Sequence, residues 1–458
     1  MKADKIIVNP FSYISFMDIE ILQEINEHGK ARIKGVLDKN TDEKLLENLP
    51  VDETVTIYAM QEDEISEILF QGVLCQASYS VENGIKILEI YVVTYSYFMD
   101  LKENTRIFQN GKRTFSELAK WIGKENGAGV ICTEGKQQEI GQIMVQYQET
   151  DWAFLKRIAS KINTFLVADH LNAKPSLSFG PVKPKRREIH DFSCTMVRNL
   201  SEYYLRQNQE GTVCREQDVL SYRVTTREIL RLCTPVLFNE KEYYVKSVRM
   251  ELLGSELVNV YELAVEGGLR TTEAENKKIS GLSIDGKIHQ VKQDRVQVSF
   301  LQDVDAPCIW FPYATAYSSP DGAGWYCMPE IGDAVRIYFP DSKENHALAI
   351  NMVHLTCDLR EDPKIKYIRS PHNKEIRFEP GAIYITNHQG MMVCLDDKRG
   401  VSINSNKDIV IMAGENIDLH SEKEIRISGD EGVIARQGDN RIEIKDGIKQ
   451  IARMIAQK

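Results

Sequence analysis

An eight-residue repeat of apolar side chains near the C-terminus constrains the fold of this chain more than any other feature. Two apolar positions, two residues apart, recur every eight residues between 400 and 435. The first position holds Val401, Ile409, Ile417, Ile425 and Val433, and the second holds Ile403, Ile411, Leu419, Ile427 and Ala435. Because residues two apart in a strand share one face, each repeat predicts a short strand with an apolar face, followed by polar residues.

A single chain has only a poor way to fold this repeat. Short hairpins with turns at SNKD, AGEN, SEKE and SGDE would give a thin sheet whose apolar face stays in water. If three chains each contribute eight residues to a layer, the apolar faces meet on a common axis and no long strand edge remains exposed. We therefore expect a triple-stranded β-helix needle at residues 376–447. The middle positions should point outward, although two of them are apolar: Ser402, Val410, Asp418, Arg426 and Ile434.

Composition argues against several other classes of protein. The 458 residues carry a net charge of -10, which disfavours nucleic-acid binding because such binding needs a basic face. The chain has no run of about 18 apolar residues, and its N-terminus lacks a signal-peptide core. Nine scattered cysteines without zinc-ligand spacing predict reduced thiols. We expect synthesis and assembly in the cytoplasm.

The remaining sequence predicts a mainly β protein with minor α content. Runs rich in β-branched and aromatic residues occupy much of residues 1–266. Two segments inside that range carry helix-start signals. Thr114 followed by Glu117 forms a capping box, and Thr150 or Asp151 precedes a helix with one apolar face. Residues 1–266 are therefore predicted to hold β domains with inserted helices.

Polar stretches with glycine or proline divide the rest of the chain. Residues 267–280 predict one linker, and residues 356–375 predict a second one. Between them, short strands spaced about ten residues apart predict a small barrel or sandwich at residues 281–355.

Residues 448–458 form a separate terminal segment after the needle. Their apolar spacing predicts a short helix with Ile448, Ile451 and Ile455 on one side. Such a side would serve as a docking surface or, preferably, as a plug that closes the end of the needle.

Three stretches resemble one family of proteins. QYQETDWAFLKRIAS, residues 146–160, resembles the segment by which VgrG spike proteins of type VI secretion and hub proteins of contractile phage tails are recognised. Its matching residues are Gln146, Tyr147, Asp151, Trp152, Phe154, Leu155 and Arg157. GAGWYCMPEIGDAVRIYF is similar to part of the OB-fold that follows the hub, through Pro329, Gly332, Asp333 and Val335. The terminal repeat is similar to the needle of the same proteins, and TRIFQN resembles phage-type hubs more than long type VI spikes.

This resemblance implies a homotrimeric hub and spike of a contractile injection system. Residues 1–266 would form β-barrels that give a ring on which the inner tube protein starts, with baseplate proteins around it. The OB-fold at residues 281–355 would brace the neck, and the needle would concentrate the force of contraction on the target cell envelope. A PAAR-like protein at the tip is also implied. The protein would then travel as part of a phage tail-like particle and be ejected or secreted on contraction.

The motifs of common enzymes are missing, so the expected role is structural. The sequence has no HExxH, GxSxG, Walker loop or GxGxxG, and we expect no catalytic residue, metal or cofactor. Two alternatives stay open: a tail-associated cell-wall-degrading enzyme, and a carbohydrate-binding protein that uses aromatic residues such as Trp325. We expect most aromatics of the OB region to lie in the core or an interface: Trp310, Phe311, Tyr313, Trp325 and Tyr326. Phage tails, bacteriocin-like particles, type VI systems and extracellular injection systems all remain possible settings.

Overall fold

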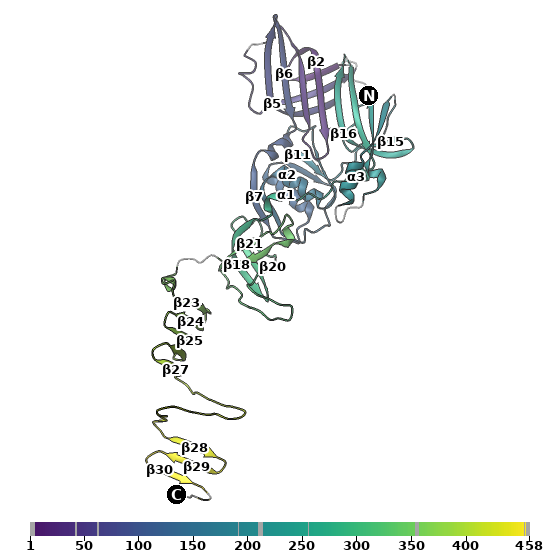
Figure 1. Ribbon diagram of the computed structural model, residues 1–458. Helices are drawn as coiled ribbons and strands as arrows, with labels where there is room; N and C mark the ends of the chain where they lie inside the picture. Colours follow the sequence, from purple (N-terminus) through teal and green to yellow (C-terminus); the bar gives the residue numbers. More distant parts are fainter. Residues whose placement is uncertain are drawn as a thin grey trace. The chain divides into compact units, whose positions relative to one another are not determined.

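The protein is described from a computed structural model (Figure 1). The structure describes residues 5–41, 44–61, 64–190, 192–208, 214–254, 256–352, 357–452 and 454. The chain divides into two compact units, Met1–Val353 and His354–Lys458.

A 12-stranded sheet forms the largest part of the first unit, in the order β1-β4-β5-β6-β3-β2-β16-β17-β14-β13, with β15 beside β16 and β12 beside β15 (Figure 1). Burial alternates along β3 from Lys30 to Leu37, as expected for strands with one face in the core. The strands of this sheet are β1 (Lys5–Asn9), β2 (Tyr13–Glu24), β3 (Lys30–Leu37), β4 (Thr54–Gln61), β5 (Glu64–Glu82), β6 (Ile85–Val93), β12 (Arg187–Glu188), β13 (Ser193–Arg198), β14 (Leu220–Thr226), β15 (Pro235–Phe238), β16 (Lys241–Leu253) and β17 (Glu256–Ala264).

A smaller α+β module is inserted between the two halves of this sheet in the sequence. The predicted capping box is confirmed, because the Thr114 side chain accepts a hydrogen bond from Glu117 N and the Glu117 carboxylate accepts one from Thr114 N. Both predicted helices are present. The module contains η1 (Tyr95–Asp100), β7 (Glu103–Phe108), α1 (Phe115–Glu125), β8 (Gly129–Cys132), β9 (Met144–Thr150), α2 (Asp151–Ser160), β10 (Leu166–Ala168) and β11 (Ser176–Phe179).

A five-stranded sheet in the order β20-β19-β18-β21-β22 completes the first unit. Its strands are β18 (Ser283–Lys292), β19 (Arg295–Phe300), β20 (Phe311–Pro312), β21 (Ala334–Tyr338) and β22 (Leu348–Ile350), with η4 (Glu344–His346) before the last. Residues 267–280, predicted as a linker, are packed: they contain part of α4 (Glu266–Leu269) and all of η3 (Lys277–Ile279), and Leu269 and Ile279 are buried. Two further short helices, α3 (Leu200–Gln207) and η2 (Glu216–Val219), lie between β13 and β14 in the sequence.

The second unit consists of two antiparallel meanders separated by extended chain. The strands of the first meander are β23 (Lys366–Arg369), β24 (Glu375–Glu379), β25 (Ala382–Thr386), β26 (Met392–Asp396) and β27 (Gly400–Asn404), after η5 (Asp358–Arg360). Those of the second are β28 (Val433–Gln437), β29 (Asn440–Ile444) and β30 (Ile448–Ile451). Residues 405–432, all of them described, contain no assigned strand.

The helix predicted from Ile448, Ile451 and Ile455 is wrong. Residues Ile448–Ile451 are strand β30, in which Ile448 lies opposite Ile444 and Ile451 lies opposite Arg441 of β29. Pairing with the preceding strand therefore overrides an apolar spacing that also fits a helix. Ile455 lies outside the described residues. In the described part of the chain, no helix is long and apolar enough to cross a membrane.

Candidate functional site

The signature segment, residues 146–160, runs from strand β9 into helix α2. Thr150 caps the helix, since its side-chain oxygen accepts a hydrogen bond from Ala153 N at 3.1 Å. A threonine in this position satisfies a donor that the first turn of a helix leaves free. The turn from strand to helix is therefore encoded locally, and it places the side chains before and after Thr150 on one buried junction.

Asp151 is a buried carboxylate at the start of α2. Its Oδ1 atom accepts hydrogen bonds from Gln146 Nε2 at 2.8 Å and from Arg106 Nη1 at 2.7 Å. Its Oδ2 atom accepts one from Asn126 Nδ2 at 2.7 Å. A buried charge is tolerated when it is paired and hydrogen-bonded in this way. Asp151 therefore ties β7, β9 and the end of α1 to the first turn of α2.

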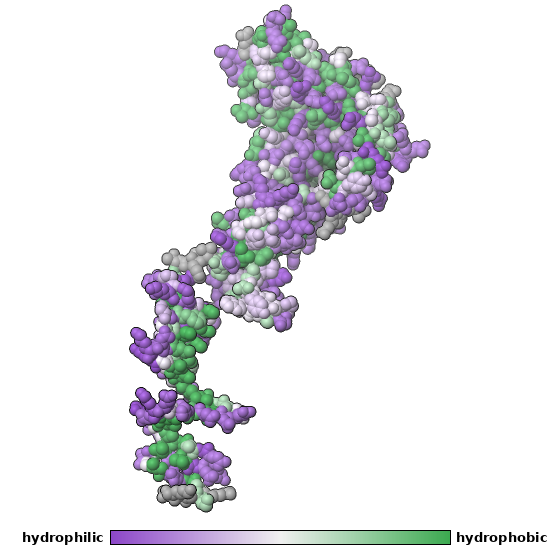
Figure 2. All heavy atoms as spheres, viewed as in Figure 1, coloured by the Kyte–Doolittle hydropathy of each residue, from purple (hydrophilic) through white to green (hydrophobic). Residues whose placement is uncertain are grey.

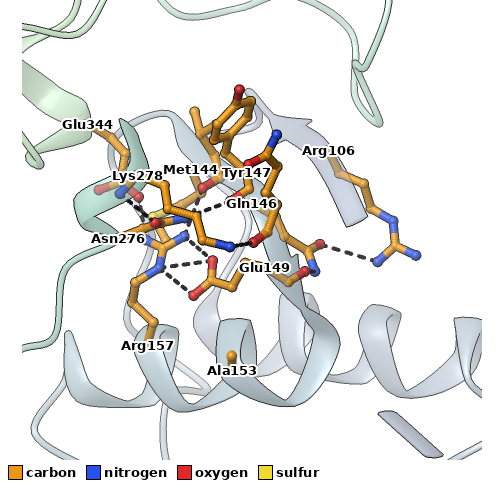
Figure 3. A network of polar contacts seen from close by, with 12 residues as sticks. Arg106, Met144, Gln146, Tyr147, Glu149, Ala153, Arg157, Asn276, Lys278 and Glu344 are labelled. Carbon is orange, nitrogen blue, oxygen red and sulfur yellow. Dashed lines mark hydrogen bonds and ion pairs between the residues drawn. The ribbon is translucent and has the colours of Figure 1, made fainter. Parts of the chain in front are cut away.

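Arg157 is the centre of a second buried network (Figure 3). Its guanidinium donates to both carboxylate oxygens of Glu149, at 3.0 and 3.2 Å from Nε, to Val145 O at 2.8 Å, and to Glu344. It also lies 5.1 Å from the ring centroid of Phe154. Burial by itself would lower the pKa of Arg157, but the carboxylates of Glu344 and Glu149 raise it above its usual value.

Glu344 brings the five-stranded sheet into this network. It lies in η4, is almost fully buried, and accepts from Arg157 and from Lys161 Nζ at 3.2 Å. Two further side chains contact the strand end at this junction: Asn276 donates to Tyr147 O at 2.9 Å, and Lys278 donates to Gln148 O (Figure 3). Sequence reasoning missed Glu344 because the segment ENH carries no pattern that sets it apart from any surface loop.

The α+β module and the five-stranded sheet share one hydrophobic core. Ile107 of β7 and Val145 of β9 are fully buried among residues of β18, β19 and β21. The backbone continues this contact, since Ile107 N donates to Gln302 O and Val304 N donates to Ile107 O, both at 2.9 Å. A common core therefore joins the β18–β22 sheet to the α+β module, although residues 267–280 were predicted to be a linker.

The aromatic residues of the signature segment serve packing. Trp152 donates from Nε1 to Asn26 O at 3.2 Å, and its ring lies 4.3 Å from that of His28. Phe154 stacks on Phe108 with centroids 5.6 Å apart. Leu155 is fully buried in the same cluster. These side chains position α2 and present no surface to a ligand.

The OB signature residues form the turn into β21. Asp333 accepts a hydrogen bond from Glu330 N at 2.9 Å, and Gly332 has a positive φ of 91°, a conformation that favours glycine. Val335 then enters the core of the sheet. A proline such as Pro329, at the start of the turn, disfavours a helical conformation of the residue before it. The four residues thus set the direction of one central strand.

The aromatics of the β18–β22 sheet divide into two groups. Phe311 is buried in the core and Tyr313 packs against it, as expected. Tyr317, Trp325 and Tyr326 are exposed instead, on a loop that Thr315 closes by donating to Trp325 O at 2.7 Å. Trp310 is partly buried. Core packing therefore does not explain this exposed loop.

The apolar repeat of the second unit lies in water when one chain is considered alone. Except for Val433, every member proposed for the needle core is more than half exposed: Val401, Ile403, Ile409, Ile411, Ile417, Leu419, Ile425 and Ile427. Figure 2 shows green, apolar residues gathered along this unit. Ile448 and Ile451 of β30 are exposed as well. Exposed apolar side chains gathered in this way mark an interaction site.

Comparison with known proteins supports the fold. Residues 285–354 match the family described as the type VI secretion system/phage-baseplate injector OB domain. A search of curated proteins finds no match. Among solved structures, the c3393 protein of E. coli, a type VI secretion component with structural similarity to the T4 bacteriophage tail proteins gp27 and gp5, aligns with a TM-score of 0.52 and 12% identity, over 75% of this chain and 99% of that chain.

Two forms of a second solved complex align over more of the chain. The half-lidded PdpA–VgrG complex of Francisella gives a TM-score of 0.59 at 10% identity, over 88% of both chains. The lidless PdpA–VgrG complex gives 0.56 at 10% identity, over 85% of this chain and 93% of that one. The resemblance to VgrG-type spikes and the mainly β architecture with an OB-fold are thereby confirmed, and identities this low establish likeness of fold alone.

Proposed function

We propose that this chain, which has the fold of VgrG-type spikes and carries a match to the injector OB domain, is the homotrimeric hub and spike of a contractile injection system. Its work is mechanical: the hub nucleates the inner tube, and the needle carries the tip that meets the target envelope. Catalysis is not part of this role. Assembly takes place in the cytoplasm, and contraction ejects the protein with the tube.

The observation that carries this proposal is the exposed apolar repeat. Between residues 405 and 432, described throughout, the chain has neither a strand partner of its own nor any cover for its isoleucines. Backbone groups and apolar side chains in that state need partners. Two further copies supply both, because each layer then holds three strands whose apolar faces meet on the axis.

The packed joint between the OB-fold and the α+β module supports the hub role of the first unit. The Arg157 network and the core around Ile107 join the OB-fold to the α+β module. A part that transmits the force of contraction gains from such a joint, since buried charge pairs and shared packing resist local opening. Residues 1–266 would contact the tube protein and the baseplate proteins. Residues 267–280, which were predicted to be a linker, contain short helices that pack onto the first unit.

The end of the needle is the place for a tip partner. Ile448 and Ile451 are exposed on strand β30, and three copies of them would give an apolar end face. We assign this face to closing the trimer, with a PAAR-like protein as the occupant of its outer side. The domain limits proposed here are hub 1–266, OB-fold 281–355, needle 376–447 and tip segment 448–458.

Electron microscopy of the purified full-length protein tests the proposal. We expect particles with threefold symmetry, a ring-shaped hub and one narrow needle. A cell-wall hydrolysis assay on the same sample should show no activity above a buffer blank. Particles with twofold symmetry, single globular chains or clear hydrolysis would each contradict the proposal.

The exposed aromatic loop favours a second candidate, carbohydrate binding through the OB-fold. Tyr317, Trp325 and Tyr326 are exposed and all belong to the lining of one surface hollow, and sugars stack on such rings. Glycan-array binding that disappears in Trp325→Ala, but not in a variant of the half-buried Trp310, would support this candidate. No binding by the wild-type protein would remove it.

A further inference from the structure

A run of basic residues connects the α+β module to the second part of the large sheet. Residues 183–187 read KPKRR, with four cations and no acidic residue, in a chain whose net charge is -10. The run follows β11 and ends in strand β12. All four cations are exposed: Lys183, Lys185, Arg186 and Arg187. We call residues 183–187 the basic run.

The side chains of the basic run are not used by the fold. None of the four cations has a hydrogen bond or an ion pair with any residue that the structure describes. Other arginines of this part of the sheet are paired, as Arg227 is with Glu256 and Arg231 is with Glu67. Clustered positive charge without a nearby carboxylate attracts anionic ligands. The basic run therefore presents its charge to a partner.

Strand β12, at the end of the basic run, has an open edge. It pairs in parallel with β15, with Arg187 opposite Val236 and Glu188 opposite Leu237, and with no other strand among the described residues. The other side of β15 pairs with β16 (Figure 1). The free edge of β12 carries backbone donors and acceptors, and an extended peptide can pair with such an edge.

An apolar hollow of about 250 Å³ lies beside the start of the basic run. Val182 and Lys183 line it, as does Pro235, which precedes the residue that pairs with Arg187. Further apolar groups of its lining come from Phe165, Pro181 and Leu269. Sites for small molecules usually measure about 300 to 1,000 Å³. The apolar hollow is therefore better suited to a single large side chain.

The carboxylates at the rim of the apolar hollow are already engaged. Arg270 donates to Glu134 at 2.8 Å and to Glu266 at 3.0 Å. The Tyr244 hydroxyl donates to Glu242 at 2.6 Å. Among the described residues of the lining, Lys183 is the charged side chain that has no partner. The apolar hollow and the basic run therefore form one surface that favours negative charge.

An acidic peptide fits this surface better than a nucleic acid. Single-stranded nucleic acids bind by stacking bases on aromatic rings, but Phe165 is buried and Tyr244 is half-buried. Exposed carboxylates are also close to the cations, since Glu188 follows the basic run and Glu242 lies at the rim. They would repel a continuous phosphate backbone. A peptide can instead place its acidic residues at selected positions.

We propose that β12, the basic run and the apolar hollow together bind an acidic, extended segment of a partner protein. The segment adds a strand to the open edge of β12, sets its carboxylates against the cations, and inserts one apolar side chain into the hollow. Every group of this site belongs to one chain, so the site does not depend on the proposed trimer. Cations on an edge strand can also serve only to repel other strands, and in that case no peptide binds.

Selection on the full-length protein from a library of random peptides, each about ten residues long, tests the proposal. We expect the selected peptides to be rich in Asp and Glu and to share one large apolar residue. The charge-reversed variant Lys185→Glu, Arg186→Glu, Arg187→Glu should select no such peptides. It should fold normally, because these side chains are exposed and unpaired among the described residues. Selection of no sequence, or of sequences without acidic residues, overturns the proposal.

A matched variant separates the site from a general effect of net charge. Lys287→Glu, Lys292→Glu and Arg295→Glu change the net charge by the same amount, at exposed positions of β18 and β19. Fluorescence anisotropy with a synthetic selected peptide should show binding about tenfold weaker for the charge-reversed variant. Binding by the matched variant should equal that of the wild type. An equal loss in both variants overturns the assignment of the site.

Changes to the peptide test the apolar hollow and the strand edge. Serine in place of the shared apolar residue should weaken binding about tenfold, because the hollow is left unfilled. Methylation of one backbone nitrogen at a time should weaken binding at alternate positions, since an added strand donates every second N–H to its neighbour. A peptide that tolerates all these changes, or a single-stranded oligonucleotide that binds as tightly, overturns the proposal. Light scattering on the charge-reversed variant tests the trimer separately, and its mass should equal that of the wild type.

Discussion

The two compact units differ in where their apolar side chains lie. The first unit closes three hydrophobic clusters within one chain. In the second unit the buried hydrophobic residues, among those described, are Ala382 and Cys394, whereas the isoleucines of the repeat are exposed. The first unit therefore has the core that a single chain needs to fold. The second lacks such a core, and in the proposed trimer its stability would depend on association with other chains.

Removing the second unit from the repeat onward should have the largest effect. Deletion of residues 397–458 removes the exposed apolar repeat through which the proposed trimer would associate, so the trimer should dissociate at micromolar concentration. The thermal unfolding temperature of the remaining hub should stay within a few degrees of the wild-type hub transition, because its core is complete. Sedimentation and calorimetry measure the two quantities. A truncated protein that stays fully trimeric would contradict this assignment.

A charge on the axis of the proposed needle should weaken the trimer almost as strongly as this deletion. Ile411 and Val410 are 72% and 75% exposed in one chain. In the strand that the proposed needle would form here, the two residues would lie on opposite faces. Ile411→Asp would bury three carboxylates in one layer, at a cost on the order of several kcal/mol. Val410→Asp would instead leave its three carboxylates in water. Trimer dissociation on dilution should increase strongly for the first variant alone, and equal behaviour of the two would argue against a common axis.

Within the first unit, breaking the buried Arg157–Glu344 pair should lower the free energy of unfolding by about 3 kcal/mol. Glu344→Ala removes one of the two carboxylates that compensate Arg157, and loss of one partner leaves part of a buried charge uncompensated. Urea unfolding of the truncated hub reports the change. The control Asp285→Ala breaks an exposed pair with Arg336 and should cost less than about 1 kcal/mol. Similar losses of unfolding free energy in the two variants would mean that the buried network contributes little to stability.

Acid should destabilise the first unit through His170. The pKa of His170 is lowered from 6.5 to about 4, mainly by burial. The carboxylate of Asp169 acts to raise this pKa, whereas the charge of Arg231 lowers it further. The unfolded chain therefore takes up the proton first, and stability is lost as the pH falls from 6.5 to 4, by about 3 kcal/mol in total. His170→Asn should flatten this part of the pH profile, whereas a variant of the exposed His289 should not. If the unfolding free energy of His170→Asn falls between pH 6.5 and pH 4 as steeply as that of the wild type, His170 is not the source of the acid sensitivity.

Features set by neighbouring residues could be read from the sequence. Thr150 and the Thr114–Glu117 pair start their helices because capping involves groups only three residues apart. The repeat was visible because its spacing is regular over several layers. The OB signature around Gly332 was visible because a tight turn restricts the residue types that it accepts.

Features set by distant residues could not be read in this way. Glu344 meets Arg157 only after the chain has folded, and Ile107 enters the core of a sheet that begins far along the sequence. The large sheet repeats one strand order in its two halves, β1-β4-β5-β6-β3-β2 and β12-β15-β16-β17-β14-β13, although the side chains on corresponding strands differ. The spacing of Ile448 and Ile451 fits a helix, but both residues lie in a strand because they pair with β29.

The mass of the full-length protein in solution tests the central claim most directly. The claim is that the exposed repeat requires three chains. Light scattering over a hundredfold range of concentration should give three times the chain mass of 52.4 kDa, without dissociation at the lowest concentration. A stable, folded species of 52.4 kDa across the same range would contradict it.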